Sequence, residues 1–89
     1  MKLNIRIEGR EIKYQSGSYR GKDLKSLILF LRENTVSGII ISGESKSYTL
    51  LRQVAMLINM LIETSQTEVA LHTKSFQFKK NCLFPIYPD

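Results

Sequence analysis

The sequence predicts an α+β fold, a two-layer sandwich in which two helices cover one face of a mixed four-stranded β-sheet. Two stretches near the N-terminus alternate apolar and polar residues as strands do, two later stretches have helical periodicity, and a short apolar run follows each helix. The order is therefore β-β-α-β-α-β. A strand–helix–strand crossover of this length joins parallel strands in a right-handed sense, which places both helices on the same face of the sheet.

Residues 2–14 predict a β-hairpin. Apolar and polar side chains alternate on both sides of Gly9 and Arg10, and a Gly-X pair suits a two-residue type II′ turn. This turn fixes the register of the two strands and leaves their apolar side chains on one face. The predicted cross-strand pairs are Glu8 with Glu11, Ile7 with Ile12, and Ile5 with Tyr14.

Residues 22–34 predict the first helix, after turn-forming residues 15–21. Apolar residues recur at i, i+3, i+4 and i+7 and so share one face of the helix. Asn34 is expected to end it, because asparagine tolerates the left-handed conformation found at helix C-termini. The predicted core-facing residues are Leu24, Leu27, Ile28 and Leu31.

A central strand and a second helix follow. The isoleucines at 39–41 leave no polar side, which predicts a strand buried on both faces in the middle of the sheet. After the turn at 43–47, Ser45 or Ser47 is expected to cap the helix. The predicted core-facing residues of this helix are Leu50, Val54, Leu57, Ile58 and Leu61.

The C-terminal part predicts a strand at 69–71 and a tail at 75–89 that is a candidate for one further strand. The tail is too apolar to stay in contact with water in a monomer. We therefore expect it to pack on the domain or to pair with a second copy of the chain at an edge strand. Its large apolar residues are Phe76, Phe78, Leu83, Phe84 and Ile86.

Composition and charge limit the classes of function. The 89 residues, 43% hydrophobic and 24% charged, are typical of one globular domain. The formal net charge is +5, and most of it lies in residues 1–25. A solvated surface is the interpretation that we favour for this charge. A small basic nucleic-acid-binding α+β domain is the alternative function. Its candidates for stacking on bases are Tyr14, Tyr19, Phe76 and Phe78.

The sequence predicts no catalytic, metal or cofactor site. His72 is the only histidine and Cys82 the only cysteine, and neither their spacing nor their neighbours suggest an activated nucleophile. The turn SGESKS lacks the glycine that precedes the lysine of a phosphate-binding loop. We therefore expect a binding protein and not an enzyme, and we expect no nucleic acid as its partner.

Four segments follow one another along the chain: the hairpin LNIRIEGREIKY, the helix DLKSLILFL, the stretch IIISGESKSYTLLRQVAMLINML and the strand EVALHTK. In this order, with Tyr48 directly after the polar turn, they resemble the periplasmic domain of the ExbD/TolR family of biopolymer transport proteins. The likeness covers residues 3–74. It departs from the family pattern at 64–67, where family members often have glycine. We accordingly divide the chain into an ExbD/TolR-like domain, 1–74, and the tail, 75–89.

The resemblance implies a non-catalytic role in energy transduction driven by the proton-motive force. It implies homodimers and two partners, an ExbB/TolQ-like channel protein and a TonB/TolA-like protein, with peptidoglycan as a further candidate. It also implies a periplasmic location, as the soluble domain of an inner-membrane protein. The family's membrane helix, which carries a proton-linked aspartate, has no counterpart in this sequence. We therefore assign the role of that aspartate to no residue here, and in particular not to Asp23. Without the resemblance, the expected location is the cytoplasm.

The residues expected to bind protein partners lie in the second helix and the tail. Methionine is apolar and adaptable, so Met56 and Met60 suit a partner-binding surface. Filling of the core is the alternative for both methionines. The full predicted set is Tyr48, Arg52, Met56, Met60, Phe76 and Phe78.

Overall fold

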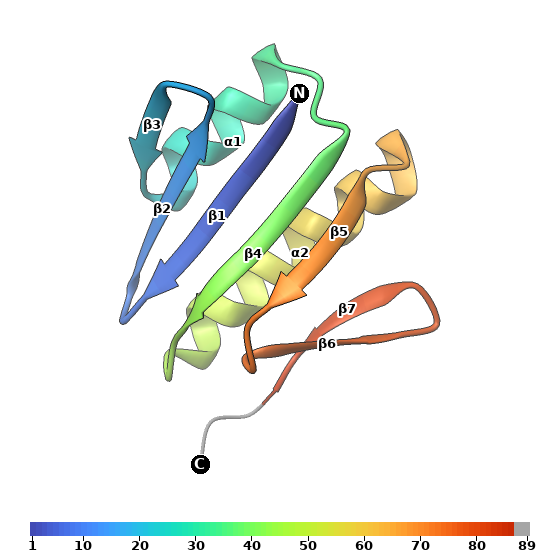
Figure 1. Cartoon of the computed structure of the whole chain (residues 1–89). Coiled ribbons are helices and arrows are strands. Elements are labelled where there is room, and N and C mark those ends of the chain that lie inside the picture. Colours follow the sequence, from blue (N-terminus) through green and yellow to red (C-terminus); the bar gives the residue numbers. More distant parts are fainter. Residues whose placement is uncertain (87–89) are drawn as a thin grey trace.

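The computed structural model describes residues 1–86. The chain forms a five-stranded sheet, two helices that cover one face of it, and a hairpin beside the second helix (Figure 1). The predicted two-layer α+β sandwich is thus confirmed. In chain order the elements are β1 (Lys2–Glu8), β2 (Glu11–Ser16), β3 (Tyr19–Lys22), α1 (Leu24–Glu33), β4 (Gly38–Glu44), α2 (Tyr48–Ser65), β5 (Glu68–His72), β6 (Phe76–Lys79) and β7 (Cys82–Pro85).

The strands of the main sheet run in the order β3-β2-β1-β4-β5. β1 pairs antiparallel with β2 and parallel with β4, and β4 is parallel to β5. At the turn between β1 and β2, Gly9 has a φ of 58°, the positive value that the first position of a type II′ turn needs. The predicted register of this hairpin is confirmed: Glu8 lies opposite Glu11, Ile7 opposite Ile12, and Ile5 opposite Tyr14.

The fifth strand, β3, lies in the segment expected to be a turn. It is short, contains Gly21 and shows no apolar alternation, so its sequence alone does not indicate a strand. The ring of Tyr14 lies against Gly21, and a Cβ atom at Gly21 would be 2.2 Å from that ring, so a side chain there would require the ring to move. The tail adds no strand to the main sheet, because β6 and β7 pair with each other in a separate sheet.

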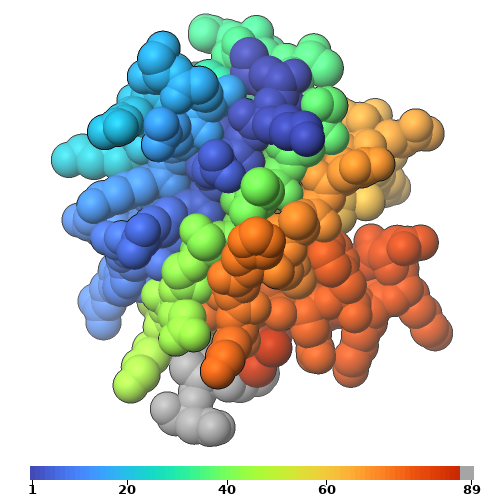
Figure 2. Space-filling model, viewed as in Figure 1, coloured from blue at the N-terminus to red at the C-terminus, as the bar shows by residue number. Residues whose placement is uncertain are grey.

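The second face of the sheet is open. Ile39 and Ile41 are buried under the helices, whereas Ile40, which points to the other side, is only half-buried. Figure 2 views this other side, where β1, β4 and β5 reach the surface with no helix over them. The prediction that β4 is buried on both faces is therefore wrong. Both helices lie behind the sheet in the view of Figure 1, so they cover the same face, as expected for two right-handed crossovers that lead in the same direction across the sheet.

Side chains define both ends of α1. Asp23 caps its start and accepts a hydrogen bond of 2.7 Å from the Ser26 amide. Asn34 ends the helix, but its backbone is extended, with a φ of −134°, so the expected left-handed conformation is wrong. The Asn34 side chain instead donates to the Phe30 carbonyl at 2.9 Å and so satisfies a free carbonyl of the last turn. The left-handed conformation occurs at the end of α2, at Gln66.

The turn between β4 and α2 joins distant parts of the fold. Ser47 caps α2 and accepts a hydrogen bond of 3.4 Å from the Leu50 amide. Ser45 is buried, donates from its hydroxyl to the Gly9 carbonyl in the first hairpin turn, and accepts from the Ser47 amide at 3.0 Å. Its backbone amide donates to Ser75 Oγ at 3.3 Å. The polar residues of this turn therefore connect the first hairpin, α2 and the start of the tail.

The core-facing side of α2 differs slightly from the prediction. Leu57 and Leu61, which were expected to face the core, are only partly buried. Leu51 and Ala55 are fully covered in addition to the predicted residues. Both precede Asn59 by whole helical turns, and Asn59 is the residue that binds β7. The β6–β7 hairpin thus packs against α2 on the side of Asn59.

Candidate functional site

The tail packs on α2 as a hairpin. The Asn59 side chain donates to the Leu83 carbonyl at 2.9 Å and accepts from the Leu83 amide at 2.6 Å. Leu83 and Phe76 are only 1% and 3% exposed, so the hairpin contributes to the core. Of the two arrangements expected for the tail, the structure has packing on its own domain. Residues 87–89 of the predicted tail lie outside the described residues.

Most of the predicted partner-binding residues lie at the surface. Met56 and Met60 are 67% and 59% exposed, so neither fills the core. Arg52 is exposed one turn before Met56, on the same side of α2. Phe78, which is 40% exposed, lies in β6 of the hairpin, whose other strand, β7, packs on α2. We name Arg52, Met56 and Met60 the methionine surface.

The other two predicted residues are placed differently. Tyr48 is the first residue of α2 and is half-buried. Phe76 lies in the core, where the folded domain does not present it to a partner. Alternation along β6 could not separate Phe76 from Phe78, because both side chains face the same side of the strand. Only the position of the strand relative to α2 decides which of them is covered.

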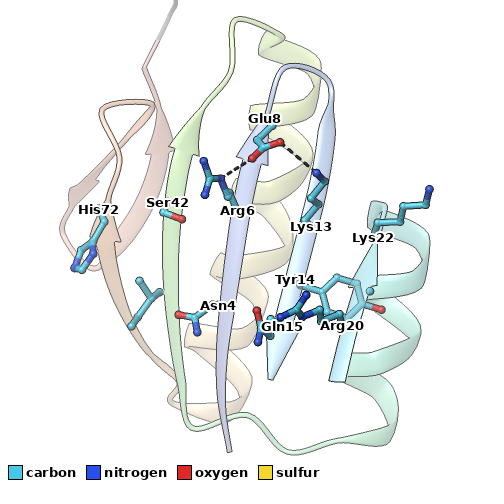
Figure 3. A pocket seen from close by; sticks show the side chains of 12 residues that line it. Asn4, Arg6, Glu8, Lys13, Tyr14, Gln15, Arg20, Lys22, Ser42 and His72 are labelled. Carbon is cyan, nitrogen blue, oxygen red and sulfur yellow. Dashed lines mark hydrogen bonds and ion pairs between the residues drawn. The ribbon is translucent and has the colours of Figure 1, made fainter. Parts of the chain in front are cut away.

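A row of basic side chains crosses the open face of the sheet (Figure 3). Cross-strand pairing places Lys22 of β3 opposite Lys13 of β2, and Lys13 opposite Arg6 of β1. Neighbouring strands lie about 4.8 Å apart, so three cationic side chains begin side by side. The same row continues on β4 and β5 with Ser42 and His72. We name these five residues the basic row.

A second row of side chains lies next to the basic row. From β3 to β4, Arg20, Gln15, Asn4 and Ile40 are in register with one another. The two rows form the floor of a shallow hollow of about 920 Å³. Most side chains around this hollow are hydrogen-bond donors, and Glu8 supplies the one carboxylate among them.

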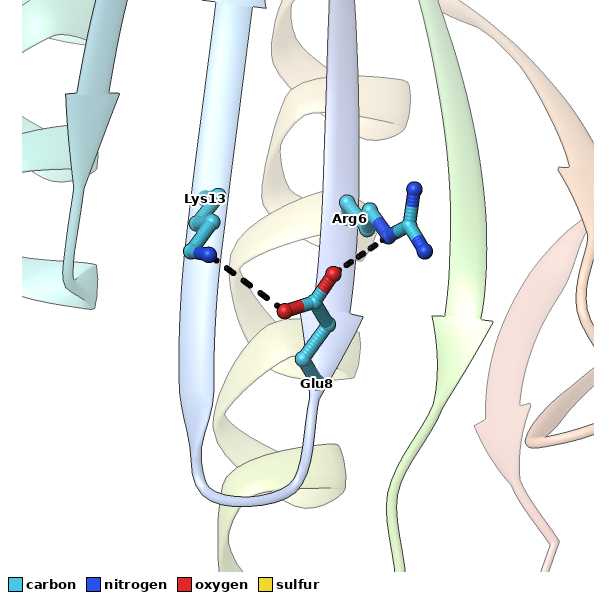
Figure 4. A network of polar contacts seen from close by, with 3 residues as sticks. All are labelled: Arg6, Glu8 and Lys13. Carbon is cyan, nitrogen blue, oxygen red and sulfur yellow. Dashed lines mark hydrogen bonds and ion pairs between the residues drawn. The ribbon is translucent and has the colours of Figure 1, made fainter.

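Glu8 balances part of the positive charge (Figure 4). Its two carboxylate oxygens lie 2.6 Å from Arg6 Nε and 3.4 Å from Lys13 Nζ. These side chains remain 42–66% exposed, so each pair contributes at most about 1 kcal/mol to stability. Within residues 1–86, no carboxylate pairs with Lys22 or Arg20. The hollow therefore keeps an excess of positive charge.

Aromatic residues gather on the opposite face of the sheet from the basic row. Tyr14 and Tyr19 pack on Phe30 of α1, with ring centroids 5.5 and 5.1 Å away. The Tyr14 hydroxyl also lies 2.5 Å from Ser26 Oγ, and its ring borders the hollow only where Gly21 leaves space. The pKa of the Tyr19 phenol is raised, first by its hydrogen bond with Tyr14. These rings hold β3 against α1.

His72 and Cys82 are not brought together by the fold. His72 lies at the end of β5 in the main sheet, whereas Cys82 is exposed at the start of β7 in the hairpin. In the part of the chain that the structure describes, no group of three His, Cys, Asp or Glu side chains is placed to hold a metal ion. The open face of the sheet and the methionine surface are thus the candidate sites.

The basic row was not predicted, although part of it has a signal in the sequence. The predicted hairpin register already implies that Arg6 lies opposite Lys13 on the face away from the core. Lys22 joins them only because β3 forms, and Ser42 and His72 join only through the parallel pairs of β4. Comparisons give no further guide, because no family model, no curated protein and no solved structure matches this chain. Over residues 1–86, helices long and apolar enough to cross a membrane are absent.

Proposed function

We propose that this chain is a non-catalytic docking module of an energy-transduction complex of the ExbD/TolR type, driven by the proton-motive force. In this role it acts in the periplasm, as the soluble domain of an inner-membrane protein. It forms homodimers and binds an ExbB/TolQ-like channel protein and a TonB/TolA-like protein. The proposal is supported by the segments that resemble the family, since they fold together into one unit of sheet and helices.

The exposed methionines of α2 are the observation that carries the proposal. Large apolar side chains are mostly covered in a folded domain, yet Met56 and Met60 are exposed four residues apart, on neighbouring turns of one helix. Methionine adapts to irregular partner surfaces, and both methionine and arginine are enriched in protein interfaces. Burial of each methionine would contribute about 1.5–3 kcal/mol to binding.

Nucleic-acid binding, the alternative function, has less support. Proteins that bind single strands combine positive charge with aromatic rings on which bases stack. Here the basic row lies on the open face of the sheet, whereas Tyr14 and Tyr19 pack against α1 and Phe76 lies in the core. Phe78 belongs to the hairpin and is distant in the fold from the row.

Calorimetric titration against the periplasmic segment of the TonB/TolA-like protein from the same genome tests the proposal. We expect the wild-type domain to bind. The double variant Met56→Glu/Met60→Glu should bind at least about tenfold more weakly, a loss of about 1.4 kcal/mol. Leu29→Glu is the matched control, because Leu29 is 51% exposed on α1 and lies outside the methionine surface. This control should bind as the wild type does.

Two results would contradict the proposal. One is the absence of wild-type binding both to this segment and to the ExbB/TolQ-like protein of the same genome. The other is an equal loss of affinity in the Leu29→Glu control, because the methionine surface would then have no special role. Sedimentation of the same samples tests homodimer formation, which predicts a mass twice that of the chain.

A further inference from the structure

The cationic side chains of the basic row repel one another unless an anion offsets their charge. Like charges directly opposite each other on neighbouring strands are destabilising, and Lys22, Lys13 and Arg6 follow one another across three strands. Among the described residues, Glu8 forms ion pairs with Arg6 and Lys13 alone. A bound anion would remove the repulsion that remains. The basic row therefore suits anion binding, whereas without an anion it does not stabilise the fold.

The hollow above the row is suited to phosphate groups. Arginine and lysine side chains are the usual partners of phosphate, which offers several acceptor oxygens. Because the cations begin about 4.8 Å apart, a ligand that crosses the strands needs at least two anionic groups to use the whole row. Neutral donors face the same hollow and would suit hydroxyl groups on the ligand. They are Asn4, Gln15 and Ser42.

Acidic residues limit the size of the ligand. Glu8 is in register with Glu11 on β2 and with Glu44 on β4, so an acidic row follows the basic row along the strands. A long nucleic acid or a flat anionic membrane on this face would meet these carboxylates. Among the described residues around the hollow, Tyr14 is the one Phe, Tyr or Trp side chain, and it packs on α1, so His72 is the one other ring that faces the hollow. The face therefore favours a compact ligand.

We propose that the basic row binds a compact, hydroxyl-bearing ligand with two or more phosphate groups, a polyol or sugar phosphate. Arg6, Lys13, Lys22 and Arg20 hold the phosphate groups, and the neutral donors of the neighbouring row hold the hydroxyl groups (Figure 3). This site lies on the face of the sheet that the helices leave open. It is therefore separate from the methionine surface and does not depend on the proposed docking function.

Titration of the full chain with inositol 1,4,5-trisphosphate, which carries both phosphate groups and free hydroxyl groups, tests the site at an ionic strength of about 0.15 M. We expect the wild type to bind and the double variant Arg6→Gln/Lys13→Gln to bind at least about tenfold more weakly. The control Lys25→Gln/Lys79→Gln removes the same charge from exposed positions on α1 and β6 and should keep wild-type affinity. Backbone amide NMR shifts of the wild type provide a second reading that needs no variant. They should be largest on the open face, at Ser42 and its neighbours.

Failure of the wild type to bind inositol 1,4,5-trisphosphate would overturn the proposal. Equal weakening in both double variants would also overturn it, because binding would then follow net charge alone. The same holds if the largest NMR shifts fall on α2 or on the hairpin. Single-stranded RNA and vesicles of phosphatidylcholine and phosphatidylserine in equal parts serve as competing ligands. Tighter binding of either one through the basic row would assign the face to nucleic acid or to membrane instead.

Discussion

Asn59 holds both backbone polar groups of Leu83. Its side-chain nitrogen donates to the Leu83 carbonyl at 2.9 Å, and its side-chain oxygen accepts from the Leu83 amide at 2.6 Å. An amide side chain offers this donor and acceptor in one plane, so Asn59 takes the place of a neighbouring strand for β7. Asn59 thus fixes the position of β7 on α2, together with the burial of Leu83 and Phe76 in the core.

Replacement of Asn59 should loosen the hairpin. Asn59→Ala removes two hydrogen bonds, each with a net contribution of about 1 kcal/mol, so we expect a loss of about 2 kcal/mol in the free energy of unfolding. Urea denaturation measures this loss, and hydrogen exchange of the β7 amides should speed up. Asn59→Asp keeps the acceptor and loses the donor, so its free energy of unfolding should lie between those of the wild type and Asn59→Ala. Wild-type stability of Asn59→Ala would show that apolar packing alone holds the hairpin.

Gly43 should not tolerate a side chain. Its φ is 85°, and a Cβ atom there would lie 2.0 Å from the Ile7 carbonyl oxygen. Gly43→Ala therefore combines backbone strain with a clash in the central pair of strands, and we expect a loss of about 3 kcal/mol or more in thermal or urea unfolding. Gly9→Ala is the control, because Gly9 also has a positive φ, 58°, but has open space around it. It should cost only about 1–2 kcal/mol. Equal losses of stability in Gly43→Ala and Gly9→Ala would show that the clash with Ile7 contributes nothing beyond the backbone strain.

Phe76 and Phe84 should differ sharply in their contribution to stability, although both belong to the tail. Phe76 is 3% exposed and Phe84 is 45% exposed. Truncation of a buried phenylalanine costs about 3–5 kcal/mol, so Phe76→Ala should nearly unfold a domain of this size. Phe84→Ala should change the free energy of unfolding by no more than about 0.5 kcal/mol. Similar effects of the two variants, measured by urea denaturation, would contradict the packing of the hairpin on α2.

Local patterns predicted most of the elements correctly. The alternation of the first strands and the Gly9-Arg10 turn gave the register of the hairpin, because turn type and pleat constrain residues only a few positions apart. Helical periodicity placed Met56 and Met60 away from the core for the same reason. The three isoleucines of β4 led to the wrong prediction that this strand is buried on both faces, because a run of apolar residues does not indicate whether a second layer covers the strand.

The sequence by itself thus determined the main elements and the first hairpin, both of which follow from side-chain periodicity within short segments. It gave only part of the buried side of each helix, since Phe30 of α1 and Leu51 and Ala55 of α2 are buried in addition to predicted residues. Only the tertiary structure decided that one face of the sheet stays open, that the tail covers part of α2, and that Lys22, Lys13 and Arg6 form one row. The open face and the packing of the tail arise from contacts between residues distant along the chain, and Lys22 joins the row only because β3 pairs with β2. Such contacts depend on how the layers pack as a whole, and no local pattern specifies them.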